Sequence, residues 1–301
     1  MTTESLRTLV AGLVDYAGLF PPAALTMEPT VKNYDAYRRG ENSWLLARLV
    51  MPVARLGEFE AAIEKLQPSG TDFRAWKLTS PVGPNVAADV VKILEFNQRH
   101  APAEKDGFTI ESVEMRAASA QEIRAAASQI PKSLQVYFEI PLSNTLEESL
   151  GAIAELGARA KVRTGGESPE MFPSGADLAH FFSLCAKKGV AFKASAGLHR
   201  PVRGSQRYTY KPDSASGIMH GFLNVFLTAS FVREGTNEHD ATELLAEQSP
   251  AAFAWDEKGV AWRGHCIGNK QLAAARKLFC LTVGSCSFQE PTDNLKALGL
   301  I

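Results

Sequence analysis

Short runs of strand-forming residues alternate with amphipathic windows up to residue 195, and this rhythm constrains the fold more than any other feature. Seven such runs can be read, at 14–20, 44–51, 73–79, 109–116, 134–140, 160–163 and 191–195. The windows between them repeat apolar residues at the helical period, as Val86, Val90 and Ile93 do. Strands that are separated by helices form parallel βαβ units. The chain is therefore expected to belong to the α/β class.

Local signals mark where some of these helices begin and end. Ser119 is followed three residues later by Glu122, and Thr145 by Glu148, so each pair predicts a capping box at a helix start. Gly189 directly follows a lysine pair and predicts the end of a helix. These signals support helices in the windows after the runs at 109–116, 134–140 and 160–163.

The number of units and the chain length favour a (β/α)₈ TIM-type barrel over an open doubly wound sheet. No G-x-G-x-x-G motif follows the first run, so a nucleotide-binding open sheet has no support. We expect the eighth strand at 281–288, followed by a last helix at 291–298. The alternative is that residues 222–228 close the barrel.

The rhythm breaks after residue 195. Residues 200–215 are rich in Arg, Ser, Tyr and Pro and predict a long functional loop that acts as a lid. Helices are expected at 220–232 and 271–281, with a hairpin at 253–266. Residues 1–301 are therefore expected to form a single barrel-like domain, with an insertion at about 200–270 and an elaborated C-terminal segment.

Composition excludes several classes of function. Hydrophobic residues make up 45% of the chain and charged residues 22%, as in soluble globular proteins. The net charge of −1 and the lack of a basic block argue against nucleic-acid binding. No apolar run reaches the ~18–20 residues of a membrane span, and no secretory signal is visible. The four cysteines form no CxxC pair and fit a reducing cytoplasm, whereas the oligomeric state stays open, a homo-oligomer included.

Charged residues alternate with apolar ones along the predicted strands. In a barrel, alternate residues face the axis, and apolar residues such as Trp76, Leu78 and Val162 are assigned to the helix-covered outer face. The inward set is then Arg48, Lys77, Glu114, Arg116, Glu139, Lys161, Arg163 and Lys193. Such side chains are rarely buried unless they are paired, so they either fill the core as ion pairs or line the active-site mouth. We favour the second, and the excess of bases suits a phosphorylated or carboxylated substrate.

Two lysines on neighbouring predicted strands carry the sharpest chemical hypothesis. A lysine that is crowded by other cations can be neutral and attack a carbonyl group as a Schiff-base nucleophile. Lys161 and Lys193 are placed to interact in this way, and Glu114 or Glu139 could shuttle protons. A carboxylate in contact with Lys161 would have the opposite effect and would favour its ammonium form.

The residues around these lysines resemble a known family. Lys161-Val-Arg-Thr-Gly-Gly and the run from Phe192 to Leu198, with Lys193-Ala-Ser at its centre, look like the two lysine motifs of the deoxyribose-phosphate aldolases. The resemblance implies a (β/α)₈ class I aldolase in which Lys161 is the Schiff-base nucleophile and Lys193 its cationic neighbour. It also implies that Glu114 stands where the family has a proton-relay Asp. Arg163 and Ala196 depart from the family pattern.

Further binding candidates lie next to the strands. Consecutive amides at Thr164-Gly165-Gly166 suit an anion, although a plain turn explains them equally well. His199 and Arg200 begin the long loop, either as an anion clamp or as a solvated basic turn. The full set of expected substrate-binding residues is Arg48, Lys77, Arg116, Arg163, Thr164, Gly165, Gly166, Ser195, His199, Arg200 and Ser285.

The leading expectation is an aldolase-like carbon–carbon lyase that acts on a small anionic carbonyl compound without a cofactor. One alternative is a metal-assisted lyase or isomerase that uses Glu114, Glu139 and a histidine, although no HxH or HExxH motif supports a metal. Another is a non-catalytic barrel that binds an anionic ligand. Cys286 is not expected to be a nucleophile, because the sequence positions no histidine to activate it.

Overall fold

Eight parallel strands close into a barrel in the order β1-β13-β7-β6-β5-β4-β3-β2, which confirms the predicted (β/α)₈ fold. The computed structural model describes residues 2–66, 76–100 and 107–301, so the expected strand residues 73–75 lie outside the described part. The barrel strands are β1 Val14–Tyr16, β2 Leu46–Val50, β3 Trp76–Pro81, β4 Phe108–Arg116, β5 Gln135–Glu139, β6 Arg159–Arg163, β7 Phe192–Ser195 and β13 Cys280–Ser285.

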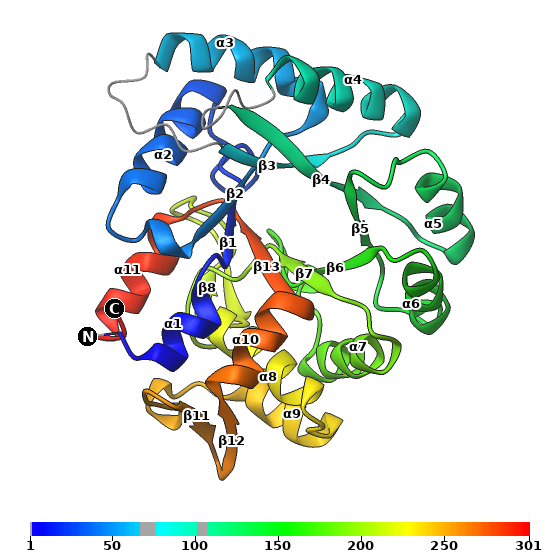
Figure 1. Ribbon diagram of the computed structural model, residues 1–301. Helices are drawn as coiled ribbons and strands as arrows, with labels where there is room; N and C mark the ends of the chain where they lie inside the picture. Colours follow the sequence, from blue (N-terminus) through cyan, green and yellow to red (C-terminus); the bar gives the residue numbers. More distant parts are fainter. Residues whose placement is uncertain (1, 67–75, 101–106) are drawn as a thin grey trace.

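Helices surround the barrel, as Figure 1 shows. They are α1 Glu4–Val10, α2 Met27–Arg39, α3 Leu56–Leu66, α4 Val86–Arg99, α5 Ala120–Ala127, α6 Leu146–Glu155, α7 Gly175–Lys188, α8 Phe222–Arg233, α9 Glu238–Ala246, α10 Asn269–Leu278 and α11 Gln289–Ala297. Among the described residues, no helix combines the length and the apolar character of a membrane span.

All three predicted helix boundaries hold, but the capping bond predicted for Thr145 does not form. The Ser119 side chain accepts a hydrogen bond from the Glu122 amide and caps α5, and Gly189 ends α7 in the left-handed conformation with φ of 66°. Thr145 precedes α6, but its hydroxyl lies 2.9 Å from that of Ser143 and makes no cap. The Thr145 hydroxyl is thus bonded to the Ser143 hydroxyl and does not accept a hydrogen bond from a backbone amide of the helix.

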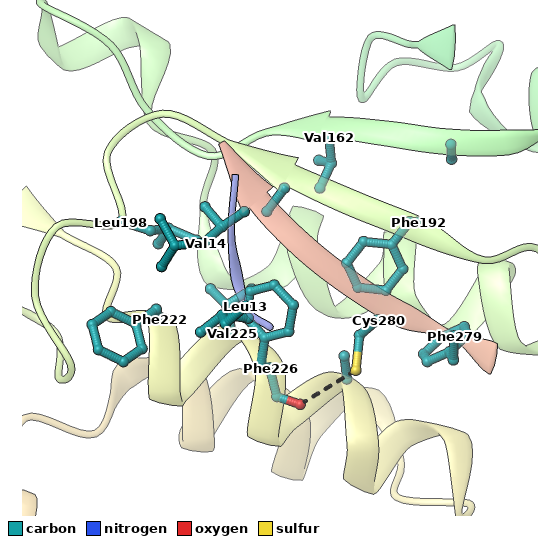
Figure 2. Close-up of a cluster of buried hydrophobic side chains, with 14 of the residues drawn as sticks. Leu13, Val14, Val162, Phe192, Leu198, Phe222, Val225, Phe226, Phe279 and Cys280 are labelled. Atoms are coloured by element: carbon teal, nitrogen blue, oxygen red, sulfur yellow. Dashed lines mark hydrogen bonds between the residues drawn. The ribbon is translucent and has the colours of Figure 1, made fainter. Parts of the chain in front are cut away.

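The C-terminal strand β13 closes the barrel between β1 and β7, and the alternative at 222–228 is wrong because these residues belong to α8. The helix expected at 220–232 is confirmed as α8, and because every residue from 222 to 232 is buried, it is covered on all sides. Figure 2 shows Val225 and Phe226 of α8 under Phe192 of β7 and Cys280 of β13. The Cys280 thiol donates to the Phe226 carbonyl oxygen at 3.8 Å.

Two small antiparallel sheets lie in the chain between β7 and β13. Strands β8 Gly204–Arg207 and β9 Ser216–Met219 form a hairpin where a long loop was expected. The β8 residues show no alternation of apolar and polar side chains, which explains why no strand was predicted there. The expected hairpin at 253–266 is a three-stranded sheet of β10 Ala254–Trp255, β11 Gly259–Trp262 and β12 His265–Gly268.

Candidate active site

A cavity of about 1320 Å³ opens at the C-terminal ends of the barrel strands, where the active sites of this fold lie. Its walls come from the ends of β4 to β7, from the loop after β1 and from the β8–β9 hairpin. The polar lining residues used below are Glu114, Arg116, Glu139, Lys161, Arg163, Gly166, Ser195, His199, Arg200, Arg207, Tyr210, Cys286 and Glu290. Phe20, Pro21 and Pro22 form an apolar part of the wall.

Lys161 presents a primary amine to this cavity from strand β6. Its Nζ lies 2.9 Å from Glu114 Oε2 and 2.9 Å from Glu139 Oε2, and 15% of its side chain is exposed. The strand register pairs Lys161 with Glu139 of β5 on one side and with Lys193 of β7 on the other. Lys161 is therefore reachable from the cavity and has a carboxylate on each of two sides.

Lys193 also points inward, but it lies beneath the cavity and does not line it. Its Nζ is 2.5 Å from Asp15 Oδ2 and 2.5 Å from Glu114 Oε1, and it lies 5.3 Å from the centre of the Tyr137 ring. Burial lowers the pKa of Lys193, but Asp15 and Glu114 outweigh burial and raise it above its ordinary value. Because Glu114 lies between the two lysines, the expectation that Lys193 acts on Lys161 as an uncompensated cation is corrected.

The two glutamates differ in their surroundings. Burial raises the pKa of Glu114, but Lys161 and Lys193 together hold it far below its usual range, and Thr79 donates a hydrogen bond to Oε1 at 2.9 Å. Burial likewise raises the pKa of Glu139, but Lys161 and Arg163 outweigh burial and lower the pKa below its ordinary value. Arg163 Nε lies 3.3 Å from Glu139 Oε1, at the wall of the cavity. Both carboxylates line the cavity, but Glu114 is the more buried of the two and also joins the buried network through Lys193.

The remaining predicted binding residues divide between the cavity and its support. Arg116, Arg163, Gly166, Ser195, His199 and Arg200 line the cavity. The Ser195 hydroxyl is buried and has no hydrogen-bond partner among the described residues, so it is available to a ligand.

Thr164, Gly165 and Ser285 do not line the cavity. The Thr164 hydroxyl donates to the Ala196 carbonyl oxygen at 2.6 Å, and Ser285 donates to the Ser287 carbonyl oxygen at 2.7 Å. A Cβ added at Gly165 would lie 2.7 Å from Gly197 Cα, so Gly165 allows two backbones to approach closely. These three residues shape the rim instead of presenting groups to a ligand.

Arg48 and Lys77 face inward at the opposite, N-terminal end of the barrel, which corrects their assignment to the substrate site. Arg48 Nη2 lies 3.1 Å from Glu111 Oε2, and Lys77 Nζ lies 3.0 Å from Glu111 Oε1. Arg48 lines a separate hollow with Arg159 and Thr282. Strand alternation predicts which face a side chain takes but not its height along the barrel axis.

The structure adds a cluster that the sequence did not indicate. His199 Nδ1 lies 2.5 Å from Glu290 Oε2, across 91 residues of sequence, and the imidazole also interacts with the Cys286 thiol. Burial lowers the pKa of His199, but Cys286 and Glu290 outweigh it and raise the pKa to about 9. The expectation that no histidine is positioned at Cys286 is therefore wrong. No local motif links these residues, since they come together only when the barrel closes.

The metal-assisted alternative finds no ligand set in the part of the chain that the structure describes. Among these residues, no three His, Cys, Asp or Glu side chains converge in the manner of metal ligands. His220 is buried and its Nε2 lies 2.8 Å from the Pro173 carbonyl oxygen. Glu114 and Glu139 are engaged with Lys161 and Lys193.

Comparison of the chain with protein-family models, with curated proteins and with solved structures finds no match.

Proposed function

We propose that the protein is an aldolase-like carbon–carbon lyase that forms a Schiff base between Lys161 and a small anionic carbonyl substrate. The observation that carries the proposal is the position of Lys161 Nζ, which faces the cavity at the catalytic end of the barrel. The two carboxylates at 2.9 Å are the contacts expected to favour its ammonium form, so Lys161 becomes a nucleophile only after it gives a proton to one of them. The resemblance of the Lys161 and Lys193 motifs to the deoxyribose-phosphate aldolases supports the same assignment.

Glu139 is the proton shuttle of the proposed reaction. It accepts a proton from the Lys161 ammonium group, and the freed amine attacks the carbonyl carbon to form a carbon–nitrogen bond. The carbonyl π-bond breaks, and its oxygen takes a proton from the attached nitrogen to become a hydroxyl group. Glu139 then gives its proton to this hydroxyl group, which leaves as water, and an iminium ion remains. Glu139 is placed for both transfers, because its Oε2 contacts Lys161 Nζ and the residue lines the cavity.

Bond cleavage uses the iminium ion as an electron sink. A base removes the proton of the hydroxyl group on the β-carbon, and the carbon–carbon bond breaks. The electron pair of that bond forms the double bond of an enamine, and the electron pair of the carbon–nitrogen π-bond moves to nitrogen. The enamine carbon takes up a proton, and water then hydrolyses the imine to release the second product and restore Lys161. We assign the proton transfers to Glu139 and to water in the cavity.

Glu114 stabilises the cationic intermediate. Its lowered pKa keeps it ionised at neutral pH, and its Oε2 lies 2.9 Å from the nitrogen that carries the positive charge of the iminium ion. Lys193 and Thr79 fix the other oxygen of the same carboxylate, at 2.5 and 2.9 Å. Lys193 is thus a positioning residue in this proposal.

Arginines around the cavity supply the sites for the substrate anion. Arg163, Arg200 and Arg207 line its wall, and the unpartnered Ser195 hydroxyl adds a hydrogen-bonding group. Guanidinium groups bind carboxylate and phosphate with two parallel hydrogen bonds. This set favours a substrate that carries one of these groups.

Hydrogen exchange next to the carbonyl group tests the proposal without knowledge of the natural substrate. Small keto acids and phosphorylated aldehydes and ketones are incubated with the protein in D₂O, and the signals of the α-protons are followed by NMR. Enamine formation predicts protein-dependent loss of these signals for at least one compound. Lys161→Arg should abolish the exchange, whereas Lys77→Arg, at the other end of the barrel, should preserve it. Exchange that survives in Lys161→Arg would contradict the proposal.

A further inference from the structure

Four side chains from three parts of the chain meet at one wall of the cavity, next to the β8–β9 hairpin. Glu290 lies 2.5 Å from His199 Nδ1 through its Oε2, and the imidazole interacts with Cys286. Tyr210, in the turn of the hairpin, donates to Glu290 Oε2 at 3.1 Å and has its hydroxyl 3.6 Å from Cys286 Sγ. A thiol, an imidazole and a carboxylate in series form the arrangement that activates a cysteine nucleophile.

We propose that Cys286 is a second nucleophilic centre in this cavity and that it accepts acyl groups from activated esters or thioesters of anionic acids. In this proposal His199 is the base, and Glu290 holds the imidazole in position. The inference does not depend on the Schiff-base chemistry of Lys161, because it uses different residues and a different reacting bond.

The proposed reaction is acyl transfer to sulfur. His199 acts in its neutral form, whose share grows as the pH rises toward its raised pKa of about 9. In that form it takes the proton of the Cys286 thiol, and the thiolate attacks the carbonyl carbon of the ester. A carbon–sulfur bond forms, the bond to the leaving group breaks, and His199 gives its proton to the departing alcohol or thiol. Water, deprotonated by His199, then hydrolyses the thioester, which releases the carboxylic acid and restores the thiol.

Two features of the wall support this assignment. Arg200 follows His199 directly, Arg207 ends β8, and both arginines line the cavity. Their positive charges favour an acyl group that carries a negative charge of its own. Burial, Cys286 and Glu290 raise the pKa of Tyr210, so its phenol stays protonated and donates to Glu290. That hydrogen bond helps to fix the carboxylate which orients His199.

The chain carries its own reference thiol. Cys266 is exposed on β12, among the three strands β10 to β12 and outside the cavity lining, and Cys185 and Cys280 are buried. An electrophile that reacts with thiols in general labels Cys266. An electrophile that is activated by the cluster labels Cys286.

The experiment uses mono-para-nitrophenyl succinate as the anionic acyl donor and the full-length protein. Release of para-nitrophenolate is followed by absorbance, and the acylated cysteine is located by peptide mass spectrometry. We expect one succinyl group on Cys286, formed at least tenfold faster than on Cys266. Cys286→Ser should abolish the fast phase and Cys266→Ser should preserve it. His199→Gln should slow acylation of Cys286 by about 10²-fold or more, the usual contribution of a positioned base.

Equal acylation rates at Cys286 and Cys266, or a Cys286 rate that His199→Gln does not change, would overturn the proposal. If circular dichroism shows that His199→Gln does not fold, Glu290→Gln provides the second test, because it keeps both reacting groups and removes the charge that orients the imidazole. The neutral ester para-nitrophenyl butyrate should react at least tenfold more slowly than the succinate. Equal rates for the two esters would overturn the anionic substrate class.

Discussion

Glu114 binds Lys193 through Oε1 at 2.5 Å while its other oxygen contacts the lysine that faces the cavity. The same buried ammonium group contacts Asp15, which also lies 3.9 Å from Arg48 Nη1. Charges of opposite sign therefore alternate through the interior of the barrel from one end to the other. The alternation explains how this barrel holds charged side chains that are rarely buried without partners.

Replacing Lys193 by Met should destabilise the fold by about 3–5 kcal/mol, because it leaves two carboxylates without their shared cation in the interior. Both Asp15 and Glu114 are buried and within 2.5 Å of Lys193 Nζ. Chemical denaturation at pH 7 measures the change in the free energy of unfolding.

Lys77→Met is the matched control for this substitution. Lys77 makes an ion pair with Glu111, but 60% of its side chain is exposed, so its loss should cost at most about 1 kcal/mol. Similar losses in the two variants would contradict the conclusion that Lys193 anchors the buried network.

Acid should weaken the fold through Glu114. The pKa of this carboxyl is lowered in the folded protein, so its contribution is complete above its ordinary value of about 4.3 and is lost as the pH falls below that value. The free energy of unfolding, measured between pH 6 and 3, should fall less steeply in Glu114→Gln than in the wild-type protein. Equal slopes would show that Glu114 carries no proton-linked stability.

His199 should make the fold less stable at alkaline pH. Its pKa is raised to about 9, so its contribution is complete below the ordinary value of about 6.5 and is lost as the pH rises through 9. Unfolding measured between pH 6 and 9.5 should show this decline, and Glu290→Gln should flatten it. His180→Gln, which changes an exposed histidine, serves as the control and should retain the decline.

The periodicity of the sequence was sufficient to predict the barrel fold, because each βα unit has its own local pattern of apolar residues. It failed where polarity removed the pattern. Strand β8 has no apolar face and carries no period that sequence analysis can detect, whereas the helix expected at 220–232 agrees with α8.

The site was predictable only to the extent that strand alternation defines it. Alternation placed Glu114, Glu139, Lys161 and Lys193 inside the barrel, as the structure shows. It could not show that Lys193 lies below the cavity, because that depends on where along the barrel axis each side chain ends. Contacts between segments far apart in the sequence, such as His199 with Glu290 of α11, depend on closure of the whole barrel.

We expect a small anion to bind less tightly when Arg200 is removed. Arg200 is exposed, lines the cavity and lowers the pKa of Glu290, so Arg200→Ala should raise the Kd for inorganic phosphate or a small dicarboxylate roughly tenfold, about 1.4 kcal/mol. Isothermal titration calorimetry at low ionic strength measures the affinity. Arg124→Ala, which removes an arginine paired with Glu155 on the outer helices, should leave the Kd unchanged. An identical Kd in Arg200→Ala would place the anion elsewhere.

Reductive trapping tests the assignment of Lys161 most directly. The protein is incubated with small aldehydes and keto acids, sodium borohydride is added, and the modified residue is located by peptide mass spectrometry. The account predicts a stable adduct on the peptide that contains Lys161, with none in Lys161→Arg, because a guanidinium group forms no imine under these conditions. An adduct on another lysine, or no adduct with a carbonyl compound that the protein is shown to bind, would contradict it.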